Sequence, residues 1–340
     1  MTITINNKNK KPNVPNVRFP EFEGEWEKTK FGDIAVVVGG GTPDTNTSQY
    51  WNGKIQWFTP SEIGRNKYVY NSVRTISEEG LNKSSAKLLP IGTILLSSRA
   101  TVGECSINKK ECTTNQGFQS LIPKENISNE FVYYLIQTKR KDLIRKSCGS
   151  TFLEISANEV RKIVVSIPTI KEQDKIAKLL SLLDERIATQ NKIIDRLQTL
   201  IRGIMVELQK QGLKNGTWKK FILADVLSER SELNINLHQV FSVSVSKGVV
   251  NQVEYLGRSF SAKDTSKYHV VHYGDIVYTK SPTGSFPYGI VKQSLNHDNV
   301  AVSPLYGVYK PKNFSTGMFL HQYFMSEVNT LNYLHPLIQK

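Results

Sequence analysis

Polar side chains beside strand-like runs are the groups in this sequence best suited to chemistry. Arg99 and Thr101 follow the run 93–98, and Asn115 and Gln116 come just before another such run. Arg can donate two hydrogen bonds to guanine, Asn and Gln can pair with adenine, and Thr adapts to either base. We therefore predict that these four side chains contact base edges of a nucleic acid.

A comparable set of polar residues follows the run 275–280 in the second half of the chain. The predicted base contacts there are Lys280, Ser281, Thr283 and Tyr288. Lysine and arginine in polar loops mainly neutralise phosphate groups. On that basis we expect phosphate contacts from Arg65, Lys67, Lys83, Lys87, Lys263 and Lys267.

Each of these residues also has a plain structural interpretation. Asn115 is a residue type that forms turns, and Arg99 could sit in a surface ion pair. Each lysine taken alone could be a solvated charge. These alternatives stay open at the level of the sequence.

Other kinds of site are not indicated. The run Gly39-Gly40-Gly41-Thr-Pro lacks the GxGxxG spacing, and no GxxxxGK[ST] run exists, so neither a dinucleotide site nor a P-loop is expected. His269 and His272 lie three apart in a strand-like stretch and should face opposite sides, so we expect no metal site. The chain also lacks the glycine turn and the Asn/Asp-Pro-Pro-aromatic run of a DNA methyltransferase.

Composition agrees with binding to a polyanion. The 340 residues carry 44 Lys and Arg against 30 Asp and Glu, a net charge of +14, which favours a nucleic acid as partner. The three cysteines form no CxxC pair, so disulfides and zinc are not expected. Since neither a signal peptide nor a long apolar run is evident, we expect a soluble cytoplasmic protein.

One long helix is predicted between two β-rich flanks. It begins near residue 170, where Thr169 and Glu172 have the spacing of a capping box, and it ends at Gly212. Steps of four and three give a 3.5-residue period typical of a coiled coil, and the alternative is a long helix packed on its own domain. The seam residues are Ile176, Leu180, Leu183, Ile187, Gln190, Ile194, Leu197, Ile201, Ile204 and Leu208.

Each flank mixes short strands with a little helix. Helical spacing of aromatic residues predicts helices over 129–146 and 316–328. Short apolar runs bounded by Gly, Pro and Asn predict strands. These runs are 34–38, 93–98, 162–168, 240–245 and 275–280.

The two flanks repeat each other. The pattern that begins at Trp26 recurs from Trp218, the pattern around Gly92 recurs around Gly274, and Phe118–Pro123 recurs as Tyr306–Pro311, with offsets of 192, 182 and 188. Three matches in the same order indicate two copies of one domain. Lys340 then corresponds to about residue 152 of the first copy, so we expect a second long helix to be missing.

Several segments together resemble the specificity subunits of type I restriction-modification systems. They are VPNVRFPEFEGEWEKTKFGDI, GGGTPDT (39–45), YWNGKIQWFTPSEI (50–63), PIGTILLSSRATVG (90–103), TTNQGF (113–118) and SIPTIKEQDKIAKLLSLLDERI (166–187). The resemblance implies two α/β target-recognition domains joined by conserved spacer helices. It also implies a non-catalytic subunit that reads a split DNA target and docks two methyltransferase subunits.

The resemblance further implies that the restriction subunit joins the full complex, and that S-adenosylmethionine, ATP and Mg are held by partner subunits. The expected division is a first target-recognition domain over 1–169, a spacer helix over 170–212 and an incomplete second recognition domain over 213–340. Two alternatives remain: a half-type specificity protein that works only after self-association, and a nucleic-acid enzyme with an unrecognised site.

Overall fold

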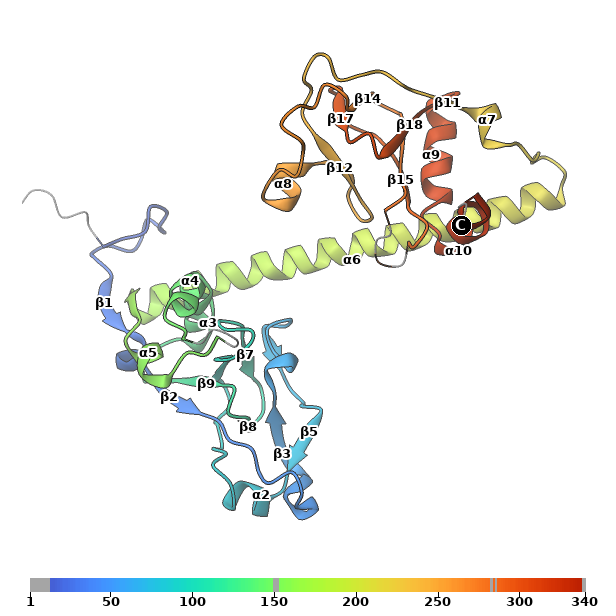
Figure 1. The fold of residues 1–340 in the computed structure, drawn as a ribbon. Coiled ribbons are helices and arrows are strands. Elements are labelled where there is room, and N and C mark those ends of the chain that lie inside the picture. Colours follow the sequence, from blue (N-terminus) through green and yellow to red (C-terminus); the bar gives the residue numbers. More distant parts are fainter. Residues whose placement is uncertain (1–12, 149–152, 282–283, 285, 338–340) are drawn as a thin grey trace, which may run out of the picture. The chain divides into compact units, whose positions relative to one another are not determined.

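The fold is that of a computed structural model (Figure 1), which describes residues 13–148, 153–281, 284 and 286–337. The chain divides into two compact units, one ending at Thr189 and the other running from Gln190. The dividing line therefore falls inside the long helix rather than at its two ends. Both units mix helices and strands, which confirms the predicted α/β class.

The first unit is built on a five-stranded sheet of order β2-β9-β6-β7-β4. A three-stranded sheet, β5-β3-β8, and a ribbon of β1 with β10 complete it. Its strands are β1 Glu27–Lys30, β2 Ala35–Gly39, β3 Trp51–Phe58, β4 Tyr68–Val69, β5 Arg74–Ile76, β6 Ile94–Leu96, β7 Cys105–Asn108, β8 Cys112–Thr114, β9 Gln119–Pro123 and β10 Val164–Ile167. Its helices are α1 Phe31–Ile34, η1 Ser48–Tyr50, η2 Pro60–Glu62, α2 Glu78–Asn82, α3 Asn129–Thr138, α4 Arg140–Arg145 and α5 Ala157–Arg161.

The second unit has a four-stranded sheet of order β11-β18-β15-β16, with two further strand pairs, β12-β13 and β14-β17. Its strands are β11 Leu227–Glu229, β12 Phe241–Ser244, β13 Gly248–Asn251, β14 His269–Val271, β15 Ile276–Thr279, β16 Ile290–Gln293, β17 Val300–Val302 and β18 Tyr306–Pro311. Its helices are α7 Leu223–Val226, α8 Gln252–Leu256, α9 Phe314–Tyr323, α10 Glu327–Leu334 and η3 His335–Leu337.

The sheets confirm the internal repeat. The order β2-β9-β6-β7 of the first unit recurs as β11-β18-β15-β16, with every neighbouring pair antiparallel. The turns that lead into β6 and β15 contain Gly92 and Gly274, whose φ angles are +87° and +89°. Such left-handed backbone favours glycine, so the same turn occurs in both copies.

Alternating and helical apolar patterns explain the core of the first unit. In β6, Ile94, Leu95 and Leu96 are all fully buried, as expected for a central strand with both faces covered. On α3, Val132 and Ile136 are four residues apart and also fully buried, so this face packs on the sheet. The predicted helix 129–146 is in fact two helices, α3 and α4, and 316–328 is likewise split into α9 and α10.

The long helix α6 (Ile170–Lys214) is present as predicted at its start and ends two residues later than expected. Gly212 does not end the helix. A Cβ there would lie 2.1 Å from the Trp218 ring, so glycine gives room for that ring, and the backbone turns at Gly216, whose φ is +67°.

The expected capping box at the start of α6 is wrong. The Glu172 carboxylate, 1% exposed, accepts hydrogen bonds from the Arg18 guanidinium at 2.8 Å and from the Trp26 indole at 3.2 Å. Since a buried carboxylate needs such partners, Glu172 joins the N-terminal segment to the start of α6 and does not cap the helix.

Candidate nucleic-acid interface

Two loops lie side by side at the end of β6 in the first unit. The backbone N–H of Ser98 donates to the Gly117 carbonyl at 2.8 Å, and Ser97 forms a bridge with Phe118. The loop 97–101 is therefore held against 115–117. Three of the predicted base contacts, Arg99, Thr101 and Gln116, lie on these loops with exposed side chains.

A glycine loop closes the same edge. Gly41 N donates to the Thr114 carbonyl at 2.8 Å, and a Cβ on Gly40 would lie 2.0 Å from the Asn115 carbonyl oxygen. The glycine run is thus a close backbone contact beneath the candidate side chains, in keeping with its lack of phosphate-loop spacing. From this loop, the Thr42 hydroxyl donates to the Gln116 amide oxygen.

Arg99 forms an exposed ion pair. Its guanidinium lies 2.9 Å from the Glu154 carboxylate, and both side chains are more than 40% exposed. Exposed pairs of this kind contribute little to stability, so Arg99 can exchange Glu154 for another partner at small cost. Thr101 shares a 3.0 Å hydrogen bond with the Ser97 hydroxyl.

Asn115 forms a turn, which is the structural alternative that its residue type suggested. Its side-chain oxygen accepts from the Gly117 N–H at 2.9 Å, which is an Asx turn. The side chain is half-buried, and its turn fixes the loop that carries Gln116.

In the second unit, Lys280 and Ser281 follow β15 and are exposed, at the place equivalent to the loop after β6. Thr283 lies outside the described residues. Tyr288 differs from the expectation of a free base contact: its ring packs with the apolar cluster of Ile276, Val291 and Leu320. In the structure, the Tyr288 side chain is therefore part of the apolar packing of the second unit.

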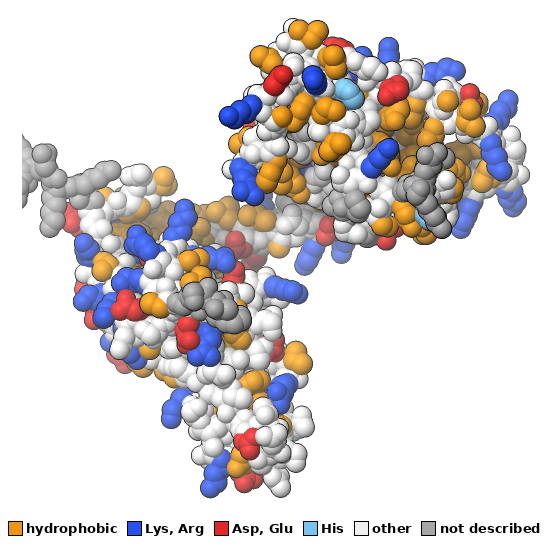
Figure 2. All heavy atoms as spheres, in the orientation of Figure 1, with side chains coloured by type: hydrophobic (Ala, Val, Ile, Leu, Met, Phe, Trp, Pro, Cys, Tyr) orange, Lys and Arg blue, Asp and Glu red, His pale blue; other side chains and the backbone are white. Residues whose placement is uncertain are grey.

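The predicted phosphate contacts are exposed, with one exception. Apart from Lys67, none of them forms an ion pair with another described residue. The exposed residues are Arg65, Lys83, Lys87, Lys263 and Lys267. Figure 2 shows lysine and arginine side chains scattered over the visible face of each unit, with acidic side chains among them.

Lys67 is the exception, and its assignment as a phosphate contact is not supported by its position. Its side chain is 13% exposed and forms an ion pair with Glu130. The ammonium also donates to the Tyr134 hydroxyl at 3.2 Å and to the Ser181 hydroxyl on α6. Aromatic rings and a carboxylate stabilise this buried cation, so Lys67 joins the first unit's sheet to the start of α6.

The tyrosines around Lys67 are shielded from water. Burial and a 2.8 Å hydrogen bond to Glu130 raise the pKa of Tyr68 to about 12. Burial, together with a 2.7 Å hydrogen bond to Asp184, also raises the pKa of Tyr134. Both hydroxyls therefore stay protonated and act as hydrogen-bond donors.

One aromatic arrangement was not predicted from the sequence. The Arg74 guanidinium lies 3.6 Å from the centre of the Trp51 ring, and Trp51 meets Trp57 edge to face. Arg74 is exposed, whereas the two indoles are buried. The tryptophans were visible in YWNGKIQW, but their proximity to Arg74 depends on the pairing of β3 with β5.

The described residues contain no group of His, Cys, Asp and Glu side chains that could hold a metal ion. His269 contacts the Tyr306 carbonyl and His272 contacts Glu232, so the two rings have separate partners. Burial raises the pKa of the Cys105 and Cys112 thiols to about 12. Such thiols are poor nucleophiles and poor metal ligands. No described helix is long and apolar enough to cross a membrane.

Residues 23–199, more than half of the chain, match the family model of the type I restriction modification DNA specificity domain. The chain belongs to this family. The specificity subunit of the type I restriction enzyme MjaIX from Methanocaldococcus jannaschii is 39% identical over 180 residues, which is 51% of this chain and 42% of that protein. A type I specificity subunit from Escherichia coli is 31% identical over 192 residues, 54% of this chain and 47% of the relative.

This member of the specificity-domain family spans about half the length of the curated relatives it matches. Its fold is similar to a crystal structure of the type I restriction-modification S subunit from M. genitalium. That similarity has a TM-score of 0.56 at 14% identity and covers 96% of this chain and 83% of the other. The family resemblance seen in the sequence motifs is thereby confirmed.

Proposed function

We propose that the chain is a DNA specificity subunit that reads a bipartite target and performs no catalysis itself. The observation that carries the proposal is the pair of equivalent strand ends. β6 and β15 occupy the same place in the repeated sheet, and each is followed by exposed polar residues of different type. Equal frameworks with unequal loops suit two readers of two different half-sites.

The proposed partners are double-stranded DNA, methyltransferase subunits and, in a full complex, a restriction subunit. The names of the relatives, which are type I restriction enzyme specificity subunits, support this assignment. S-adenosylmethionine, ATP and Mg would then be bound by those partner subunits. A protein with this role would work in the cytoplasm, where the DNA is.

The test is to produce the chain with the methyltransferase subunits of its own system and to map the methylated sites. We expect one split target sequence. Arg99→Ala should relax one half of that target and Lys280→Ala the other half, because the two residues lie in different units. Changes that fall in the same half would overturn the assignment of one half-site to each unit.

An enzyme with an unrecognised site is the other candidate, and a direct assay separates the two. The purified chain is incubated with DNA, Mg and S-adenosylmethionine, without any partner. The proposal expects neither cleavage nor methylation. Either product, formed in the absence of any partner, would show that the chain is itself catalytic.

The apolar seam of α6 supports a further part of the proposal, which is contact with another helix. Seven seam residues are 41–60% exposed: Leu183, Ile187, Ile194, Leu197, Ile201, Ile204 and Leu208. A single exposed apolar residue is ordinary, whereas a row at 3.5-residue spacing is typical of a coiled-coil contact. We propose that a second copy of the chain or a methyltransferase subunit covers it.

A further inference from the structure

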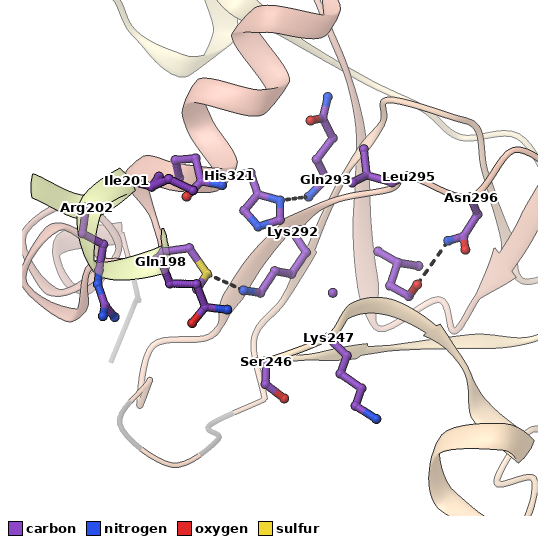
Figure 3. A pocket seen from close by; sticks show the side chains of 14 residues that line it. Gln198, Ile201, Arg202, Ser246, Lys247, Lys292, Gln293, Leu295, Asn296 and His321 are labelled. Atoms are coloured by element: carbon purple, nitrogen blue, oxygen red, sulfur yellow. Dashed lines mark hydrogen bonds between the residues drawn. The ribbon is translucent and has the colours of Figure 1, made fainter. Parts of the chain in front are cut away.

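The second unit contains a pocket whose lining is cationic. It has a volume of about 330 Å³ and lies between β16, the turn from β12 to β13, α9 and the end of α6 that belongs to this unit (Figure 3). Its charged and titratable lining groups are Arg202, Lys247, Lys292 and His321. No aspartate or glutamate is among the described residues that line it.

Lys292 is buried in this pocket without a counterion. The residue is 3% exposed, and within the described chain its ammonium donates to one acceptor, the thioether sulfur of Met325. A thioether is a weak acceptor, and an ammonium has three protons to donate. Two of its donors thus have no acceptor among the described residues.

The burial of Lys292 is costly for the folded protein. Burial lowers the pKa of Lys292 to about 8, and no nearby carboxylate offsets this effect. His321 does not supply a negative charge, since an imidazole is neutral or cationic. Its ring accepts a hydrogen bond from the Gln293 N–H, and burial lowers its pKa to about 4. A buried charge of this kind is usually paired.

The equivalent position in the first unit is satisfied within the chain. Lys292 lies opposite Val277, and Ser106 lies opposite Leu95, so the two occupy the same place in the repeated sheet. The Ser106 hydroxyl donates to the Asn66 carbonyl and accepts from the Gly64 N–H. The loop that provides these groups leads into β4, which pairs with β7.

In the described part of the second unit, the β12–β13 turn borders this place, but no strand pairs with β16 as β4 pairs with β7. β16 is the outer strand of its sheet, with no strand in the place of β4. The space that protein fills in the first unit is therefore a pocket in the second. Lysine stands in the second unit where the first unit has serine, so a positive charge lies at the position that β4 and its loop cover in the first unit.

Other hydrogen-bond donors line the same pocket. They are Gln198, Ser246, Arg202 and Lys247. In Figure 3 the side chains of Arg202 and Lys247 extend away from the Lys292 ammonium. Arginine and lysine together suit a phosphate group, which accepts several charge-assisted hydrogen bonds. The charge of three cations is better matched by a phosphate than by a single carboxylate.

We propose that this pocket binds a phosphate group, with Lys292 as the buried contact and Arg202 as the contact from α6. The group could belong to the DNA backbone or to a free phosphorylated small molecule, since both present the same oxyanion. The site does not require the chain to be a DNA specificity subunit. Inorganic phosphate can therefore probe it independently of the proposed function.

The experiment measures binding of inorganic phosphate to the full chain by calorimetry, with chloride holding the ionic strength constant. We expect saturable binding of one phosphate. Lys292→Met and Arg202→Gln should each weaken it about tenfold or more, as expected for loss of a charge-assisted hydrogen bond. Arg202 is exposed, so its variant should fold even if Lys292→Met does not.

A matched control is Lys310→Met, which removes an exposed lysine on β18 that does not line the pocket. Phosphate binding should be unchanged in this variant. The proposal is overturned if the wild-type chain shows no saturable binding, or if all three variants bind phosphate equally. It is also overturned if acetate binds as tightly as phosphate, which would indicate a site for a carboxylate of a protein partner.

DNA distinguishes the two sources of the phosphate. If the group is part of the DNA backbone, phosphate should compete with DNA, and Arg202→Gln should reduce the log–log salt slope of DNA binding by about 0.9. If the group belongs to a small molecule, DNA binding should be the same in wild type and variant while phosphate binding is lost. Both results support the pocket, and neither depends on sequence-specific DNA recognition.

Discussion

At the scale of single residues, the predicted base contact of Arg99 can be tested directly by substitution. Arg99→Ala should cost about 1–3 kcal/mol at one base pair of the target, because a bidentate contact to guanine is lost. Binding to non-specific DNA should hardly change. Affinities for a set of single-base variants of the target measure this.

Lys87→Ala is the matched control for Arg99→Ala. Lys87 is exposed and without an ion pair among the described residues, and we expect it to meet phosphate. Its loss should weaken binding to all sequences alike. If Arg99→Ala gives the same uniform loss, then Arg99 contacts phosphate or has a structural role.

His321 makes the stability of the second unit depend on pH. Its pKa is lowered from 6.5 to about 4 by burial and by the nearby Lys292. Between these values the unfolded chain binds a proton that the folded chain does not, so stability falls as pH decreases from 6.5 toward 4. The loss is at most about 3 kcal/mol.

Thermal unfolding as a function of pH checks this expectation. His321→Gln keeps a possible acceptor for the Gln293 N–H and removes the titration, so its stability should depend less on pH across this window. His335→Gln, at an exposed position, should behave as wild type. A wild-type stability that stays level from pH 6.5 to 4 would rule out the effect.

At the scale of elements, the sequence predicted most of the helices and strands whose apolar residues form clear runs or repeats. The 3.5-residue repeat located α6, and the apolar runs located β2, β6, β10, β12 and β15. The break of 129–146 into α3 and α4 was missed because Lys139, where it occurs, carries no Gly or Pro signal. Pairing between distant strands, such as β3 with β5, cannot be deduced from local spacing.

The candidate site was predictable to the same limited degree. Residue types identified Arg99, Thr101 and Gln116, and the structure places their exposed side chains on adjoining loops. The position of Lys67 does not support a phosphate contact, and its burial was not predictable because it depends on Glu130, Tyr134 and Ser181, which are distant in sequence. The Lys292 pocket was not predictable for the same reason, since the sequence of a strand does not show whether its lysine has a counterion.

Substitutions at two glycines test the backbone packing around them. Gly203 lies within α6, and a Cβ there would meet nothing within 4 Å. Gly203→Ala should therefore stabilise the chain by about 0.5–1 kcal/mol, because alanine loses less backbone entropy in a helix. Denaturant unfolding measures the change.

Gly40→Ala is the opposite case. The added Cβ would lie 2.0 Å from the Asn115 carbonyl oxygen and 2.3 Å from the Thr114 hydroxyl, so the loops must separate. We expect a clear loss of stability and a displaced Gln116. A neutral Gly40→Ala would mean that these two loops are not held together as described.

At the scale of the whole molecule, we expect a partner to cover the exposed seam of α6. Full burial of one Leu or Ile side chain is worth about 1.5–3 kcal/mol, and a protein's total stability is only about 5–15 kcal/mol. Gln190, the one polar seam residue, is exposed as well and could pair with its counterpart to fix the register of two helices. We therefore expect the purified chain to self-associate, or to need its methyltransferase partner to remain in solution.

Light scattering on the purified chain measures this association. Glutamate at Leu183 and Ile194, which are 47% and 50% exposed, should release monomers, because each charge would be buried in the contact. Glutamate at Thr199 adds the same charge to α6 outside the seam, so it should leave association intact. Since both seam positions are already solvent-exposed, their substitution should not disturb either core. A wild-type chain that is monomeric at micromolar concentration and soluble without a partner would show that the seam is not a contact surface.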